Sequence, residues 1–409
     1  MEQQEPIPHL FRTEYRKIVA VLCKRFGFDQ TEIAEDIASD TFLTAAQTWA
    51  FNGAPKNPTA WLYNVAKNKA KNHLQRHSTF EMKVAPYIIN HTPLIHESEI
   101  DLSPGNITDS QLQMLFAICH PSISKESQIA LSLRILCGFG IEEIANALLT
   151  NKDTINKRLF RAKEKLRDEK VKIEMPGGHE INERLETVLI TLYLLFNEGY
   201  YSESQDAIIR EDLCLEAMRL TYFLIENKQT NTPDVNALFS LMCFHSSRFA
   251  ARKDKNGEII LYQDQDETLW NNELITRGAY YLHQSTGQNK ISKYQLEAGI
   301  AYWNTQKADT REKWENILQL YNLLLQFEYS PIAALNRTYA LSKVNGKLQA
   351  IIEAEKLKLE NSHYYFTLLG ELYLGIDDDK AKQNFQRAFL LAKTNTDKQT
   401  IKKKLEVFK

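Results

Sequence analysis

The stretch from Asp29 to His77, DQTEIAEDIASDTFLTAAQTWAFNGAPKNPTAWLYNVAKNKAKNHLQRH, decides how the first part of the chain folds. Its apolar residues recur at helical spacing on both sides of a connector rich in Gly, Pro and Asn, which predicts two amphipathic helices. The charged residues before the connector are all acidic, whereas Lys56 to Arg76 contains no acidic residue. One helix is therefore typical of a docking surface and the other of a nucleic-acid surface.

The acidic helix is expected to start at Thr31, which has the side chain of an N-cap. Its buried side is predicted to consist of Ile33, Ile37, Phe42, Ala45 and Trp49. Glu35, Asp36 and Asp40 then lie together on a different flank. Before this helix, apolar residues at helical spacing from Leu10 to Phe26 predict a first helix that ends at Gly27.

The basic helix is expected to begin near Pro58, because proline suits the first turn. Its apolar stripe is predicted to be Leu62, Val65, Ala66, Ala70 and Leu74. The opposite face and its flanks carry Lys, Arg, Asn and Gln side chains: Asn64, Lys67, Asn68, Lys69, Lys71, Asn72, Gln75 and Arg76. Such a face can neutralise phosphates and bond to base edges, with Trp61 and Tyr63 placed to stack on bases. A solvated basic face explains the same pattern equally well.

A second helical unit is predicted from Ser124 onward. Ile129, Leu133 and Leu136 define one apolar helix, Gly138 and Gly140 turn the chain, and IEEIANALL forms a second short helix. The basic segment KDTINKRLFRAKEKLRDEK follows, with a buried stripe of Ile155, Leu159, Ala162 and Leu166 and an outer face of Asp153, Asn156, Lys157, Phe160, Arg161 and Glu164. This order is typical of a helix-turn-helix whose last helix enters the major groove, although a generic helical hairpin is an alternative.

Proline, glycine and acidic residues mark the segments between these units. Residues 79–123 lack long periodic runs and are interpreted as a linker, interrupted by a short helix from Leu112 to Cys119. Met175 to Gly178, with the sequence MPGG, marks a second boundary. We therefore divide the chain into residues 1–78, 79–123, 124–174, 179–285 and 286–409, all of them helical except the linker.

The C-terminal half remains helical and ends in predicted repeats. GEIILYQDQDETLW is expected to be a brief strand or loop before another helix through Tyr281. After Ser292 the helices come in pairs, and the small and aromatic residues Leu369, Gly370, Tyr373, Ala381, Phe385 and Ala388 are those that a tetratricopeptide-type pair places where two helices cross. Such an array offers a concave face for peptides or another domain that its tyrosines could line, but these tyrosines are better explained as core residues where helices cross.

Composition excludes several classes of protein. The chain has 409 residues, a hydrophobic fraction of 43%, a charged fraction of 25% and a formal charge of -2, so nucleic-acid binding must be local rather than global. No apolar run reaches membrane-spanning length and the N-terminus is not signal-like, which predicts a cytoplasmic protein. The five scattered cysteines are expected to be buried thiols, with no metal or cofactor.

Several blocks of the sequence resemble a known family. AEDIASDTF with NPTAWLYNVAKNKAKNHLQR, and SLRILCGFGIEEIANALL with TINKRLFRAKEKLR, are similar to the second and fourth regions of extracytoplasmic-function (ECF) RNA polymerase sigma factors. LYLLFNEGYY, FHSSRFAARKDKNGEIILYQDQDETLW and SPIAALNRTYALSKVNG resemble the subgroup with a C-terminal tetratricopeptide-like extension. The resemblance spans nearly the whole chain and implies a sigma factor that directs promoter-specific initiation and catalyses nothing itself.

The resemblance also implies roles for residues. Core RNA polymerase would be bound by the acidic helix through Glu35, Asp36, Asp40 and Phe42. The minus-ten promoter element would be captured and melted by the connector and basic helix through Lys56, Asn57, Trp61, Lys67, Asn68, Lys71, Asn72 and Arg76. The upstream element would be read by Thr154, Asn156, Lys157, Arg158, Phe160 and Arg161. The C-terminal repeats would bind an intramolecular or protein partner and regulate initiation.

Two rival hypotheses remain. A helix-turn-helix regulator with a repeat sensor domain would bind duplex DNA without polymerase, but it needs neither the acidic helix nor the linker. An enzyme in the C-terminal half would have to use scattered polar residues, namely Glu198, His245, Asp264, Asp266, Glu267 and His283. These residues form no nucleophile elbow, phosphate loop or metal-ligand spacing, so we predict no catalytic site.

Overall fold

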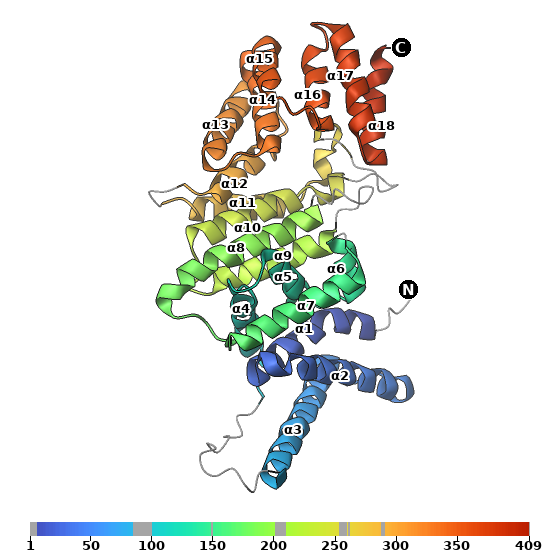
Figure 1. Ribbon diagram of the computed structural model, residues 1–409, viewed down its shortest axis with the longest axis vertical. Coiled ribbons are helices and arrows are strands. Elements are labelled where there is room, and N and C mark those ends of the chain that lie inside the picture. The colour runs from blue at the N-terminus through green and yellow to red at the C-terminus, as the bar shows by residue number, and fades with distance from the viewer. Residues whose placement is uncertain are drawn as a thin grey trace. The chain divides into compact units, whose positions relative to one another are not determined.

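The computed structural model describes residues 6–84, 100–148, 150–200, 210–252, 260, 262–287 and 291–408. Every regular element in these ranges is a helix, which confirms the all-α prediction (Figure 1). The segment around Tyr262, expected as a strand or loop, forms two short 3-10 helices in its described part, η4 (Tyr262–Asp264) and η5 (Glu267–Leu269). The chain divides into two compact units, Met1–Leu194 and Leu195–Lys409. No described helix is both long and apolar enough to cross a membrane.

Unit 1 is built on α1 (Pro6–Phe26), which contacts α2 (Thr31–Asn52), α3 (Pro58–Val84) and α4 (Pro104–Ile118). Ile18 and Leu22 on α1 are fully buried, because three helices cover its apolar stripe. Gly27 ends α1 with a φ of 79°, a conformation that favours glycine. Thr31 is not the N-cap that we expected: it is the first residue of α2, and its hydroxyl donates to the carbonyl oxygen of Phe28 at 3.0 Å.

The predicted linker contains more structure than its composition indicated. The short helix expected from Leu112 to Cys119 starts earlier, at Pro104, and becomes the 15-residue α4. Proline at its first position needs no amide partner there. The C-terminal half of α4 is mostly buried and α4 packs on α1; the polar Ser110 and Gln111 are buried too, and these two residues hid the helical period in the sequence. At the other end, α3 continues to Val84, past the boundary predicted at residue 78.

The helix-turn-helix prediction matches the next elements, α5 (Lys125–Leu131), the π-helical turn η2 (Ser132–Leu136), α6 (Ile141–Ala147) and α7 (Lys152–Asp168). Side chains cap the helices: the Glu143 carboxylate accepts from the Gly140 amide at 2.7 Å, and Asn151 Oδ1 accepts from the Thr154 amide at 2.7 Å. The stripe predicted to be buried on α7 is confirmed: Ile155, Leu159, Ala162 and Leu166. α8 (Gly178–Tyr200) begins at the MPGG boundary, but the division into units falls within it, after Leu194.

Unit 2 continues from the end of α8 through helices that pack mainly on their sequence neighbours. They are α9 (Glu211–Glu226), α10 (Pro233–Ser246), η3 (Phe249–Arg252), α11 (Asn272–Gln284), α12 (Lys293–Trp303), α13 (Arg311–Phe327), α14 (Pro331–Asn345), α15 (Lys347–Leu357), α16 (His363–Tyr373), α17 (Asp378–Leu391), α18 (Asn395–Leu405) and η6 (Glu406–Phe408). The hydrophobic α10 contacts α9, α11 and α12, so it forms the centre of the first half of this unit.

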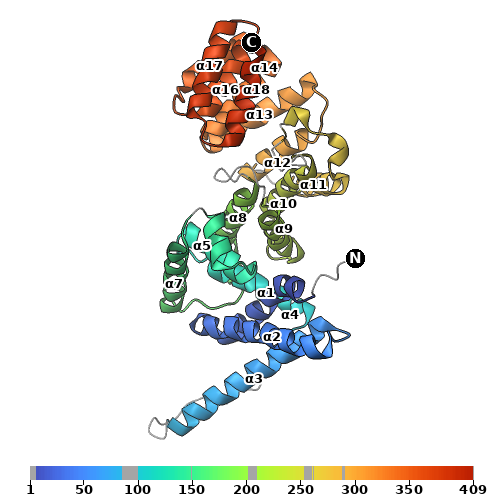
Figure 2. The ribbon, with the colours of Figure 1, turned by 90° about the vertical axis from the view of Figure 1, so that its right-hand side faces the viewer.

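The close helix crossing predicted in the C-terminal repeats is present. A Cβ atom added to Gly370 on α16 would lie 2.7 Å from the Phe385 ring on α17, so only glycine fits there. Leu369, Tyr373, Ala381 and Ala388 are buried around this point. The pairs α13 with α14 and α16 with α17 lie side by side in both views (Figures 1 and 2).

Candidate nucleic-acid interface

α3 presents the polar face that the sequence predicted. The stripe of Leu62, Ala66 and Ala70 is fully buried, and this orients the helix. The opposite side is exposed at Asn64, Asn68, Lys71, Asn72, Gln75 and Arg76, while Lys67 and Lys69 are half-buried. Both views show α3 extending past the other helices of unit 1 (Figure 2). A polar, mostly basic face on a projecting helix is sterically open to a nucleic acid.

α3 begins at Pro58, as predicted, and residues near its start also have structural roles. Lys56 and Asn57 are exposed in the connector, and Asn57 Oδ1 accepts a hydrogen bond from the Ala60 amide at 3.0 Å. Asn57 thus caps the first turn of α3 in addition to any contact with DNA. Trp61 is half-buried, with its ring 5.3 Å from that of the buried Trp49. Only part of Trp61 is therefore open to a base.

The hydroxyl of the half-buried Tyr63 is occupied within unit 1. Its hydroxyl donates to the Glu14 carboxylate on α1 at 2.5 Å, and Glu14 also pairs with Lys17 at 2.8 Å. Burial, followed by this hydrogen bond to a carboxylate, raises the pKa of Tyr63. Tyr63 therefore fastens α3 to α1 as a neutral donor, a structural role in addition to the predicted stacking.

The acidic helix α2 divides the predicted docking residues into two groups. Asp36 and Asp40 are exposed, and the Asp40 carboxylate lies 4.0 Å from Lys69 Nζ on α3. Phe42 is only 4% exposed and packs on the rings of Phe11 and Tyr15. The Phe42 side chain therefore lies in the core, as the helical spacing predicted. This corrects its assignment to the polymerase-binding surface, which came from the family resemblance.

Two apolar side chains on α2 were missed as surface candidates. Leu43 is 56% exposed and Phe51 is 89% exposed. Both follow the acidic residues along the helix, and burying such large side chains in a complex is favourable. In the sequence, each of them could have been recognised as an apolar residue that lies outside the predicted buried side of the acidic helix.

Glu35 also departs from the predicted acidic surface, because it pairs with the helix-turn-helix unit. Its carboxylate lies 3.5 Å from Arg134 Nη2 on η2 and 3.4 Å from Lys163 Nζ on α7. The Glu35 side chain is 14% exposed and that of Lys163 is 11% exposed, so water screens this pair poorly. A third ion pair joins Arg167 Nε to Asp29 Oδ1 at 3.3 Å. We call these contacts the Glu35 ion-pair cluster, which ties α7 to α2.

The outer face of α7 is open, as predicted. Asn156, Lys157 and Arg161 are exposed, and Phe160 is 62% exposed. Thr154 and Arg158 are half-buried at its edge. The face combines cations, an amide and an aromatic ring on one side of a helix that follows a tight turn. These are the groups that read base edges and thymine methyls in a major groove.

The polar residues weighed for an enzyme do not form a metal cluster. Within the described ranges, no three His, Cys, Asp or Glu side chains could hold a metal ion together. Asp266 caps η5 by accepting from the Thr268 amide at 2.9 Å, and the ring centroid of the half-buried His245 lies 4.4 Å from that of Tyr200. Burial and the nearby Arg248 and Arg252 lower the pKa of His245. All five cysteines are buried, as the sequence indicated.

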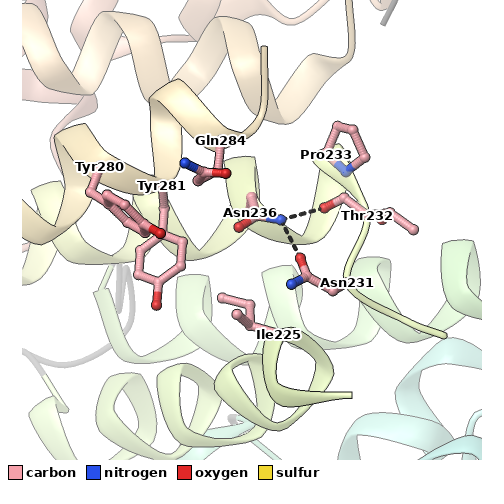
Figure 3. A pocket seen from close by; sticks show the side chains of 8 residues that line it. All are labelled: Ile225, Asn231, Thr232, Pro233, Asn236, Tyr280, Tyr281 and Gln284. Carbon is pink, nitrogen blue, oxygen red and sulfur yellow. Dashed lines mark hydrogen bonds between the residues drawn. The ribbon is translucent and has the colours of Figure 1, made fainter. Parts of the chain in front are cut away.

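Unit 2 contains a polar pocket of about 360 Å³ where α9, α10 and α11 meet (Figure 3). Its wall includes Asn231, Asn236, Gln284, Tyr280 and Tyr281. Asn236 Nδ2 donates to Asn231 Oδ1 at 2.6 Å and to the Thr232 carbonyl oxygen at 2.8 Å, as Figure 3 shows. No charged side chain lines the pocket, so it lacks the groups that would bind a nucleic-acid backbone.

Comparisons with known proteins agree with this arrangement. Residues 10–80 match the model of Sigma-70 region 2, which covers α1, α2 and most of α3. A stretch of 160 residues, 38% of this chain, is 28% identical to the ECF RNA polymerase sigma-E factor of Haemophilus influenzae and covers 83% of that protein. The N-terminal part of the chain thus contains a Sigma-70 region 2 and is similar to the extracytoplasmic-function sigma factor family. The family's second region is thus the part of unit 1 that carries the acidic α2 and the basic α3.

The C-terminal half is shared with a full-length relative. Residues 184–286 match a family of unknown function. Over 386 residues, 93% of this chain, the sequence is 31% identical to the "Uncharacterized protein R00370" of Rhizobium meliloti (strain 1021), 90% of which is covered. No solved structure matches the chain. The similarity to the Rhizobium meliloti protein therefore extends beyond the N-terminal part and includes the C-terminal half of this chain.

Proposed function

We propose that this protein is an ECF sigma factor, which binds core RNA polymerase through α2 and directs initiation at promoters that α3 and α7 recognise. The observation that carries the proposal is the presence, in one compact unit, of two exposed polar faces beside a Sigma-70 region 2 match. An acidic helix adjoins these faces. A regulator that acts without polymerase needs only one of these three surfaces.

The polymerase-binding residues in this proposal are Asp36 and Asp40, supported by the exposed Leu43 and Phe51. Charge on Asp36 and Asp40 would steer association and fix the register, and the apolar side chains would add buried area. Phe42 acts indirectly, by holding α2 against α1. Glu35 becomes available to polymerase only when the Glu35 ion-pair cluster opens.

α3 and the connector would capture the minus-ten element. Lys56, Lys67, Lys71 and Arg76 supply phosphate contacts, and these give affinity that falls with salt. The amides of Asn68 and Asn72 are exposed on the same face, where they can bond to base edges. Capturing an unstacked base costs about a few kcal/mol, which contacts with Trp61, Asn57 and polymerase would offset.

α7 would read the upstream element in the major groove. Arg161 and Lys157 suit guanine edges or phosphates, Asn156 suits an adenine edge, and Phe160 suits a thymine methyl. Thr154 and Arg158 lie at the edge of this face, in positions for phosphate contacts that set the register. None of these side chains has to break a described ion pair to reach DNA.

We further propose that the C-terminal extension, which includes tetratricopeptide-like helix pairs, regulates initiation. The close crossing at Gly370 and the paired helices α13 with α14 and α16 with α17 support a repeat-like array, which is a common scaffold for protein contacts. A chain that ends after Tyr200 would then differ from the full chain in promoter-directed transcription. Equal activity of the two would refute a regulatory role.

The test of the main proposal is run-off transcription with core polymerase on a genomic promoter library. The full chain should yield polymerase-dependent transcripts from a limited set of start sites. A chain that binds duplex DNA but yields no transcript with core polymerase would instead be an ordinary helix-turn-helix regulator.

A further inference from the structure

Three buried or half-buried cations lie around two tyrosines in unit 2. Arg248 is 8% exposed and Lys313 is 1% exposed, whereas Arg252 is half-buried. The Arg252 guanidinium lies 4.1 Å from the Tyr200 ring centroid, and the Arg248 guanidinium lies 5.4 Å from that of Tyr262. Arg248 Nη2 also donates to the Tyr200 hydroxyl at 3.4 Å. We call this group the arginine–tyrosine cluster.

Lys313 completes the cluster from α13. Its ammonium donates to the Tyr262 hydroxyl at 2.9 Å and to the Gln306 carbonyl oxygen. Burial lowers the pKa of Lys313, and the charge of Arg248 adds to this effect. The cations are therefore close enough to repel one another, and their neutral tyrosine partners do not balance the charge.

No carboxylate pairs with these cations within the described part of the chain. The acid that most affects Lys313, Asp309, already accepts from Lys343 at 3.0 Å and from the Trp314 indole. In addition, Arg248 Nε and Arg252 Nη1 are buried and have no hydrogen-bond partner among the residues that the structure describes. Buried donors are nearly always satisfied, and buried charges are nearly always paired, so the described residues leave this cluster without an acceptor that carries negative charge.

We propose that the arginine–tyrosine cluster binds a small oxyanion, the phosphate or carboxylate group of a ligand. Guanidinium groups offer paired donors that match such oxygens, and stacking on tyrosine holds the planar groups in place beforehand. Arg252 is part-exposed and gives the anion a path from solvent, while Arg248 and Lys313 supply charge from inside. The site lies within the C-terminal extension and does not depend on the proposed DNA and polymerase contacts.

Arg277 provides a matched control. It is half-buried in the same unit, and its guanidinium also stacks on aromatic rings, 4.9 Å from Tyr222 and 5.1 Å from Phe239. It does not belong to the arginine–tyrosine cluster. Arg277→Gln therefore removes an arginine–aromatic contact without removing the proposed anion site.

The experiment measures thermal unfolding and calorimetric binding of the full chain with inorganic phosphate, a phosphate monoester or succinate, at constant ionic strength. An anion that binds only the folded state raises Tm in a saturable way. We expect saturable binding of at least one of these anions by the wild type and Arg277→Gln. Binding should be about tenfold weaker or lost in Arg252→Gln and Arg248→Gln, because a charge-assisted contact is removed.

Comparing the three anions shows whether the bound oxyanion is the phosphate or the carboxylate group of a ligand. Binding of phosphate and its monoester but not succinate identifies a phosphate ligand, and the reverse result identifies a carboxylate. Arg252→Lys keeps the charge but loses the planar fork, so it should bind more weakly than wild type and more tightly than Arg252→Gln. The proposal is overturned if no anion gives saturable binding, or if Arg252→Gln binds as tightly as Arg277→Gln.

Discussion

The basic helices α3 and α7 lie in the same unit but are held in different ways. α3 is fixed by a small-residue stripe that includes Ala66 and Ala70, and its only described ion pair is the 4.0 Å contact between Lys69 and Asp40. α7 is fixed by larger apolar residues and by the Glu35 ion-pair cluster. We therefore expect α3 to move with α2 as one body, whereas charge controls how firmly α7 is tied to α2.

The largest expected effect comes from the apolar stripes that both helices use. Leu62→Ala on α3 and Leu166→Ala on α7 remove side chains that are 0% exposed. Each should lower the free energy of unfolding of unit 1 by about 2–5 kcal/mol, through lost burial and the cavity left behind. Denaturant unfolding followed by circular dichroism measures this loss. A loss for only one of the two would show that the other helix is not packed as described.

Substitutions on the outer faces of the two helices should affect binding to different forms of promoter DNA, duplex DNA for α7 and unpaired minus-ten DNA for α3. Arg161→Ala on α7 should weaken binding of the polymerase complex to duplex promoter by about 1–3 kcal/mol. Asn68→Ala on α3 should leave duplex binding unchanged and weaken binding to promoter with an unpaired minus-ten element. Fluorescence anisotropy on duplex and partly melted promoters measures both. Glu164→Gln, exposed on α7, is the control and should lose nothing.

The smallest effect concerns the ion pairs. Glu35→Gln removes the partner of the poorly screened Lys163 and of Arg134, and should lower the free energy of unfolding of unit 1 by about 1–2 kcal/mol. Asp40→Asn breaks only the exposed pair with Lys69 and should cost at most about 0.5 kcal/mol. High salt should shrink the difference between the two variants. Equal losses in both would mean that charge does not distinguish α7 from α3.

Local patterns predicted the parts of the structure that depend on helical period. The stripes on α3 and α7, the turn at Gly138 and Gly140, and the crossing at Gly370 could all be recognised from residues close together in sequence. The helical spacing also predicted correctly that Phe42 is in the core. Only the family resemblance assigned it to a surface. The first half of α4, before Leu112, was missed because Ser110 and Gln111 are buried in it as polar residues.

Contacts between distant residues could not be predicted in this way. Glu35 and Lys163 are 128 residues apart, and nothing in either segment specifies the other as its partner. The arginine–tyrosine cluster likewise gathers residues from α8, η3, η4 and α13. In both cases the charges make sense only after the apolar core has brought their helices together. The hydrogen bond of Tyr63 could not be predicted for the same reason, because its acceptor, Glu14, lies on α1.

The most direct test of the account is promoter-directed run-off transcription with core polymerase by Asp36→Lys/Asp40→Lys, compared with Gln47→Lys. All three residues are exposed on α2, but Gln47 lies outside the proposed docking residues. The account predicts that the double variant loses at least about 90% of the transcript, because like charges across an interface cost several kcal/mol. Gln47→Lys should retain transcription. Full transcription by the double variant, with the fold intact, would contradict the assignment of α2 as the polymerase-binding surface.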